Sequence, residues 1–199
     1  MAIITLTEIH EYLGIGSADA DDDTLLASQI IAAQRIIEIA TGKIFDAGTK
    51  TTRYFTWGVD TGRRGDEARV LYLDEDLAEI YAITNGDGNT ITTGNYNLLP
   101  LNNPPYRQIK LKLSASSLWT YATDPEGAIA VEGYWGWSKT APEDIKHIAK
   151  RIVGFFYRQK DAQTYDLTGF SELGQIRVKH RIPEDILQFL EFYVERVYR

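Results

Sequence analysis

The densest group of chemically capable side chains in this sequence is the acidic run Asp19-Ala-Asp-Asp-Asp23. Carboxylates at positions 1, 3 and 5 of a loop are typical calcium ligands, because Ca²⁺ prefers hard oxygen donors. A calcium loop of that kind would also place glycine at position 6 and glutamate at position 12, where this sequence has Thr24 and Ile30. We therefore interpret the run as negative charge that favours the N-terminus of a helix.

The remaining reactive residue types give no support to a catalytic or metal centre. The sequence has no cysteine, which excludes disulfides, thiolate metal sites and cysteine nucleophiles. The histidines are His10, His147 and His180. No two of them stand at helical spacing, which favours ordinary surface or partly packed histidines over a zinc site. Asp74, Asp76 and Glu79 could be paired for acid–base work, but acidic turns are common and the spacing does not separate the two cases. We expect no enzyme, cofactor or metal.

The aromatic residues cluster most tightly in Tyr134-Trp-Gly-Trp137. Rings of this kind can stack on sugars or on nucleic-acid bases. They also commonly fill the junction between a sheet and a helix, and only Lys139 supplies a cation nearby. The sequence therefore favours a structural role, and a carbohydrate- or nucleic-acid-binding module that uses this cluster stays as the alternative.

Composition and charge are those of an acidic globular protein. At 199 residues, with 44% apolar and 25% charged residues, the chain suits one domain with a sizeable core. The net charge of −7 argues against wrapping a phosphate backbone. Residues 1–149 carry 12 Lys and Arg against 21 Asp and Glu, whereas residues 150–199 carry 9 against 7. The C-terminal quarter is thus the electropositive end, and no apolar run is long enough to span a membrane.

Two helices are predicted in the first 42 residues. Thr5-Leu-Thr-Glu8 fits a capping box that starts a short helix, and Gly14 ends that helix after Leu13. The second helix follows the acidic run and ends at Thr41-Gly42. Its apolar stripe is Leu26, Ile30, Ala33, Ile37 and Ala40, widened by Ile31, Ile36 and Ile39. So wide a stripe predicts a helix that is covered on more than one side.

The middle of the chain has the short β-rich segments of a sheet. The predicted strands are Arg53–Trp57, Val70–Leu73, Ile80–Ile83, Ile109–Leu113 and Ile129–Val131. Lys110 and Lys112 alternate with apolar neighbours, which is typical of a sheet with one wet face. Asn85-Gly-Asp-Gly-Asn89 predicts a tight turn, and Asn102-Asn-Pro-Pro105 ends any strand before it.

Two further helices are predicted in the last third of the chain. Thr140-Ala-Pro-Glu143 resembles a second capping box, followed by a helix to about Lys160. Its buried stripe is Ile145, Ile148, Ala149, Ile152 and Phe156. Residues 161–181 lack a helical period, and we expect them to form an extended arm. A last helix is predicted from Pro183 to Arg199.

The predicted fold class is α+β, a single domain over residues 1–199. Residues 1–48 and 138–199 form a helical core of about four helices, two N-terminal and two C-terminal. Residues 49–137 form a small, mainly antiparallel β-sheet module inserted into that core.

Isolated apolar and aromatic residues in the arm, and tyrosines and arginines in the last helix, are predicted to bind partners. They are Tyr165, Phe170, Leu173, Ile176, Tyr193, Arg196, Tyr198 and Arg199. Tyrosine and arginine are favoured anchors in protein interfaces, and two of each lie within the final seven residues. The competing interpretation is that the last helix simply packs on the third.

An ordered set of segments resembles the head-tail connector, or adaptor, family of tailed bacteriophages. The segments are Thr5-Leu-Thr-Glu-Ile-His-Glu-Tyr-Leu13, Ala40-Thr-Gly42, Asn95-Tyr-Asn-Leu-Leu-Pro100, Gly133-Tyr-Trp-Gly-Trp-Ser-Lys-Thr-Ala-Pro-Glu-Asp-Ile145, Arg158-Gln-Lys-Asp161, Leu173-Gly174 and Ile182-Pro-Glu-Asp-Ile186. The resemblance covers nearly the whole chain and rests on the order and spacing of the segments. The sheet is larger here than in the smallest members of the family.

The resemblance implies a non-catalytic structural protein of the virion, made in the host cytoplasm. Subunits of this family form a ring, twelve-fold when assembled, below the portal protein. DNA passes through the channel during packaging without sequence-specific binding, and the ring receives the tail or stopper protein. The resemblance also implies that the C-terminal region reaches toward the portal.

Overall fold

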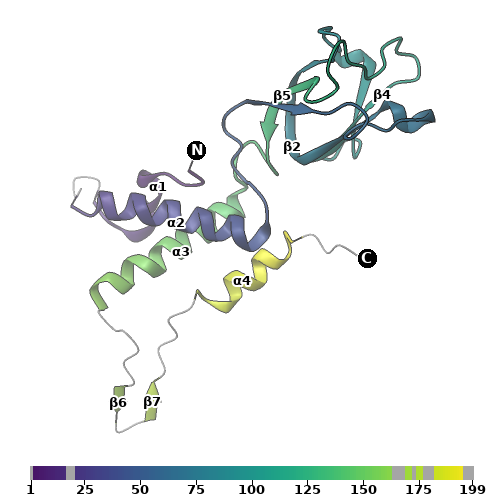
Figure 1. Cartoon of the computed structure of the whole chain (residues 1–199). Helices are drawn as coiled ribbons and strands as arrows, with labels where there is room; N and C mark the ends of the chain where they lie inside the picture. Colours follow the sequence, from purple (N-terminus) through teal and green to yellow (C-terminus); the bar gives the residue numbers. More distant parts are fainter. Residues whose placement is uncertain (1, 17–20, 163–168, 172–173, 177–181, 195–199) are drawn as a thin grey trace. The chain divides into compact units, whose positions relative to one another are not determined.

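The computed structural model describes residues 2–16, 21–162, 169–171, 174–176 and 182–194, and it confirms the α+β class (Figure 1). The chain divides into two compact units. One unit is Ile44–Ala141, and the other combines Ala2–Lys43 with Pro142–Arg199. Strands β1 to β5 lie in the first, the sheet unit, and helices α1 to α4 lie in the second, the helical unit. None of the described helices is both long and apolar enough to cross a bilayer.

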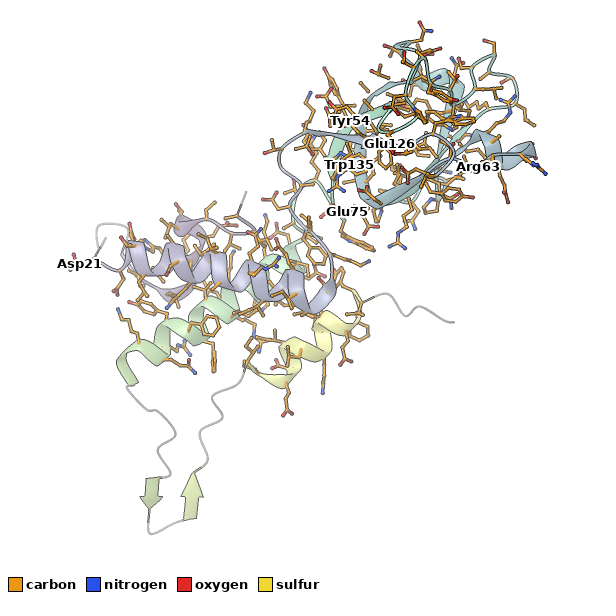
Figure 2. All side chains as sticks on the ribbon, in the orientation of Figure 1. Asp21, Tyr54, Arg63, Glu75, Glu126 and Trp135 are labelled. Carbon is orange, nitrogen blue, oxygen red and sulfur yellow. The ribbon has the colours of Figure 1, made fainter. Side chains whose placement is uncertain are left out.

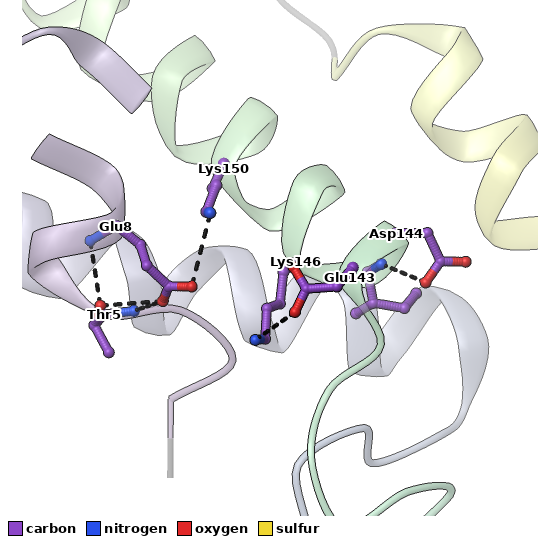
Figure 3. Close-up of polar contacts among 7 residues, drawn as sticks. Thr5, Glu8, Glu143, Asp144, Lys146 and Lys150 are labelled. Carbon is purple, nitrogen blue, oxygen red and sulfur yellow. Dashed lines mark hydrogen bonds and ion pairs between the residues drawn. The ribbon is translucent and has the colours of Figure 1, made fainter. Parts of the chain in front are cut away.

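The first helix, α1 (Leu6–Leu13), begins and ends as predicted. Thr5 Oγ1 accepts a hydrogen bond from the Glu8 backbone N–H at 3.2 Å. The Glu8 carboxylate accepts one in return from the Thr5 N–H at 2.7 Å (Figure 3). Gly14 ends the helix in the left-handed region, at φ 70°, which glycine adopts without a Cβ clash.

Helix α2 (Asp23–Thr41) buries the predicted stripe except for Ala40, which is half-buried, and two of the three residues that widen the stripe are exposed. Leu26, Ile30, Ala33 and Ile37 are buried, and Gly42 ends the helix at φ 68°. Ile31 and Ile39 remain 67% and 69% exposed, so the prediction that α2 is covered on more than one side is wrong for the single chain. Ile31 and Ile39 share one face of the helix, because they are eight residues apart. That face lies opposite the buried stripe.

Helix α3 (Glu143–Ala162) starts later than the predicted capping box requires. Thr140 would be the N-cap and Ala141 the first helical residue, but a residue before proline is disfavoured in the helical region. The helix instead begins after Pro142, whose carbonyl accepts the Lys146 N–H at 3.0 Å. The predicted buried stripe is otherwise confirmed, with Phe156 only half-buried.

Helix α4 is shorter than predicted, spanning Glu184–Glu191. Its buried residues are Ile186 and Leu190. From Phe192 to Val194 each N–H bonds the carbonyl three residues back, which is a tightened turn rather than continued α-helix. The predicted arm contains a short antiparallel pair, β6 (Gly169–Ser171) and β7 (Gly174–Ile176). The rest of residues 161–181 beyond Ala162, and residues 195–199, lie outside the described part of the chain.

The sheet unit is a five-stranded antiparallel sheet in the order β1-β5-β2-β4-β3. The strands are β1 (Thr51–Phe55), β2 (Val70–Thr84), β3 (Tyr96–Leu99), β4 (Tyr106–Leu111) and β5 (Ile129–Trp135). The two strands predicted at Val70–Leu73 and Ile80–Ile83 form a single strand, because β2 continues through the acidic residues between them. Three register shifts, between Tyr72 and Ala82, interrupt its pairing with β4 and β5.

Two other strand predictions need correction. β3 was not predicted as a strand, and β4 ends at Leu111, which leaves Leu113 exposed rather than buried. After Leu111 the chain turns, with the Ala115 N–H bonded to the Lys112 carbonyl. The predicted turn at Asn85–Asn89 is confirmed by the 2.8 Å bond from the Asn85 N–H to the Asn89 carbonyl.

Candidate partner-binding surfaces

Ion pairs connect the ends of α1 and α2 to α3 in the helical unit. Lys150 Nζ lies 3.7 Å from the Glu8 carboxylate (Figure 3). Asp22, at the N-terminus of α2, accepts hydrogen bonds from Lys160 and from the Tyr157 hydroxyl, the latter at 2.6 Å. The Lys160 ammonium, followed by the Tyr157 hydroxyl, holds the pKa of Asp22 below its usual value. Asp22 of the acidic run therefore contributes contacts between α2 and α3.

Two contacts hold α4 against α3. Arg151 donates to the Asp185 carboxylate at 2.6 Å and lowers the pKa of that carboxyl. The Tyr193 hydroxyl, just beyond α4, donates to Asp144 at 2.5 Å. Burial, followed by the hydrogen bond to Asp144, raises the pKa of Tyr193 to about 12. Tyr193 thus contributes to the fold of this unit through its hydroxyl. The backbone of α4 packs chiefly against α2 rather than α3, so the interpretation that the last helix packs on the third holds only for these two side-chain contacts.

Beyond these contacts the turn after α4 presents large apolar side chains. Phe192 is 85% exposed, Val194 is exposed, and Phe189 is partly exposed one turn earlier. The Phe189 ring lies against both Phe192 and Tyr193, with centroids 6.1 and 6.3 Å apart. An exposed aromatic group of this size is typical of a protein-binding site. The sequence prediction missed Phe189 and Phe192. Their position off the apolar stripe of Ile186 and Leu190 is the signal that could have identified them as exposed.

The other predicted interface residues are placed only in part. Phe170 and Ile176 lie on β6 and β7, opposite Gln175 and Gly169 respectively. Tyr165, Leu173, Arg196, Tyr198 and Arg199 lie outside the described residues. Tyr193 is therefore the only predicted interface residue whose side chain the structure describes.

The aromatic cluster of the sheet unit does not form one face. Trp135, which is labelled in Figure 2, is buried in the sheet unit. It donates its indole N–H to the Thr51 carbonyl at 3.0 Å. Tyr134, its neighbour along β5, points to the other side of the sheet, where Lys139 Nζ lies 4.2 Å from its ring centre. Because Trp135 fills the core, the cluster does not present its three rings to a ligand together, which favours a structural role for Trp135.

The carboxylates of β2 are held in ion pairs with three cations. Arg53 binds Asp74 and Glu75 at 2.8 and 2.5 Å. Arg107 lies 2.8 Å from Asp76, and Lys139 lies 3.0 Å from Glu79. Asp74, Asp76 and Glu79, the three carboxylates considered for acid–base work, thus each face a different cation.

The described histidines lie in ordinary contacts. His10 Nε2 of α1 is 2.8 Å from Asp23 of α2, and the His147 ring meets Tyr12 edge-on. Across the residues that the structure describes, no group of three His, Asp or Glu side chains could hold a metal ion. His180 lies outside those residues.

The fold is similar to that of chains from gene transfer agent particles. A chain in the neck of an empty particle, computed with C6 symmetry, matches with a TM-score of 0.57 and 17% identity over 98% of this chain and 91% of that chain. A chain in the neck of a native particle, computed with C12 symmetry, matches with a TM-score of 0.52 and 14% identity over 96% of this chain and 89% of that chain. A third chain, in the virion of a native particle, matches with a TM-score of 0.52 and 16% identity over 98% of this chain and 91% of that chain. No family model and no curated protein matches the sequence.

Proposed function

We propose that this protein is a structural neck component of a phage-like particle that serves as its head-to-tail adaptor. Its copies form a ring below the portal protein, extend the DNA channel and receive the tail or stopper protein. The observation that carries the proposal is the similarity of fold along nearly the entire chain to proteins in particle necks, over 98% of this chain and 91% of the first neck chain. The role is non-catalytic, and its place is the virion.

The symmetry of those neck assemblies supports a ring of identical copies. They were resolved with C6 and C12 symmetry, and a twelve-fold ring is compatible with both. A subunit in such a ring has protein on several sides. The exposed apolar residues of α2 and of the turn after α4 are suited to that setting.

The charge of the chain supports passage of DNA rather than its retention. The protein carries a net charge of −7, and like charges shorten the residence of a phosphate backbone on a channel wall. We therefore propose that DNA moves through the ring without sequence-specific binding.

The C-terminal region is the proposed docking surface for the portal. Phe192 and Val194 supply exposed apolar area directly before the last five residues. Arg196, Tyr198 and Arg199 add the residue types that anchor protein interfaces. The arm residues Tyr165, Phe170, Leu173 and Ile176 are proposed contacts to a neighbouring copy or to the tail component.

Electron microscopy of the purified protein, alone and mixed with portal rings, tests this function. We expect rings of this chain, either alone or once portal is present, and co-sedimentation with the portal. Bovine serum albumin, mixed in the same way, controls for trapping of an acidic protein. A chain that stays monomeric and unbound at every concentration with portal present would contradict the proposal.

A further inference from the structure

Helix α2 presents an unusual stripe on the side opposite its core. Ile31, Arg35 and Ile39 stand at four-residue spacing and therefore share one line of the helix surface. The two isoleucines are 67% and 69% exposed, and the Arg35 side chain is 71% exposed. The outward face of a surface helix normally carries polar residues. This α2 stripe is instead a cation flanked by two exposed apolar side chains.

Arg35 is only weakly held within its own helix. Its one ion pair among the described residues is to Glu38, at 3.4 Å. Glu38 also accepts a hydrogen bond from Gln34 at 2.8 Å. The Arg35 guanidinium has five N–H donors, so most of its donors remain available to a second carboxylate.

Helix α4 presents a pattern that complements the α2 stripe. Leu187 and Glu191 also stand four residues apart, both exposed and away from the buried Ile186 and Leu190. Glu191 has no ion-pair partner among the described residues. It is the last residue of α4, where the negative end of the helix dipole disfavours a carboxylate. A residue that costs its own helix stability is expected where it contributes to another contact.

We propose that the α2 stripe of one copy packs against Leu187 and Glu191 of α4 in the next copy. Glu191 binds Arg35, and Leu187 covers the isoleucine beside it. The inference rests on the proposed function, because a ring supplies the second copy. The two surfaces differ, so the contact is head-to-tail, and a head-to-tail contact repeats from subunit to subunit until the ring closes. The occupant is a second copy because this chain carries both complementary halves.

Charge reversal tests the contact. Arg35→Glu and Glu191→Arg each place like charges together, and the double variant restores an opposite pair in reversed order. We expect each single variant to weaken assembly at least tenfold, measured by sedimentation velocity over a concentration series with portal rings as template. We expect the assembly of the double variant to return to within about threefold of that of the wild type. Arg158→Glu, the same change at an exposed position on α3, is the matched control and should assemble normally.

The outcomes separate this contact from the proposed function. Rings of the wild type together with normal assembly of both single variants overturn the contact and leave the adaptor role standing. Single variants that form rings but lose the portal show that the stripes face the portal, which also overturns the contact. Failure of the double variant to recover, with an unchanged circular dichroism melt, overturns the pairing of Arg35 with Glu191. A wild type that never assembles overturns the adaptor role and this contact together.

Discussion

Ile152 lies in the middle of α3 and is completely buried in the helical unit, where α2 packs against α3. Shortening it to alanine removes three carbons, worth about 2.4 kcal/mol at roughly 0.8 per buried methylene. The cavity that remains adds to this, so we expect Ile152→Ala to lower the free energy of unfolding by about 3 kcal/mol. Ile152→Val should cost only about 1 kcal/mol.

Ile152→Asp adds the burial of an unpaired carboxylate to the lost apolar contact. We expect it to cost more than about 5 kcal/mol, which is comparable with the whole stability of a small domain. Little helical unit should then stay folded. Urea unfolding followed by circular dichroism at the helical band measures the series, at concentrations below assembly.

Ile39→Ala is the matched control, because the same side chain is shortened on the exposed face of α2. We expect that change to cost less than about 0.5 kcal/mol. Equal costs at Ile39 and Ile152, or an Ile152→Asp variant that melts like the wild type, would refute the assignment of the buried face.

Three further predictions concern α4 and its surroundings. Because the pKa of Tyr193 is raised to about 12, its contribution to stability is complete below the usual tyrosine value of 10.0 and is lost as pH rises toward 12. Absorbance titration of Tyr193→Phe should lack one late-titrating phenol, and an unchanged titration would contradict the bond to Asp144. The pKa of Asp185 is lowered by Arg151, so its contribution is complete above the usual value of 3.8 and is lost as pH falls through the lowered one. Asp185→Asn should therefore flatten the acid limb of the stability profile, and an unchanged limb would count against this ion pair. Deleting residues 194–199 should leave the melting curve intact and abolish co-sedimentation with portal rings; full binding would place the docking surface elsewhere.

Several local features could be predicted from the sequence because their causes lie within a few residues. The capping box of Thr5 and Glu8 needs two side chains one turn apart, and Gly14 and Gly42 are the residues that the left-handed helix ends require. The error at Thr140 is local too, because the proline at 142 disfavours a helical conformation at Ala141, which a capping box at Thr140 would require.

The aromatic and exposed residues depended on partners distant in the chain. The sequence does not distinguish Trp135 from Tyr134, which are neighbouring aromatic residues. The pairing of β5 with β1 and β2 directs Trp135 into the core and Tyr134 outward. The acidic middle of β2 was interpreted as a break, but its pairing with β4 and β5 carries the strand through it.

The sequence by itself determined the α+β class, the capped ends of α1 and α2, and the buried stripes of α2 and α3, because helical periodicity and capping act over one or two turns. Only the tertiary structure decided which isoleucines of α2 stay exposed. It also decided that Phe192 lies open beside the anchored Tyr193, and that Arg53 gathers carboxylates from a strand more than twenty residues away. Exposure and ion pairing depend on which distant residues the fold places beside a side chain, and a short-range sequence pattern does not determine those contacts.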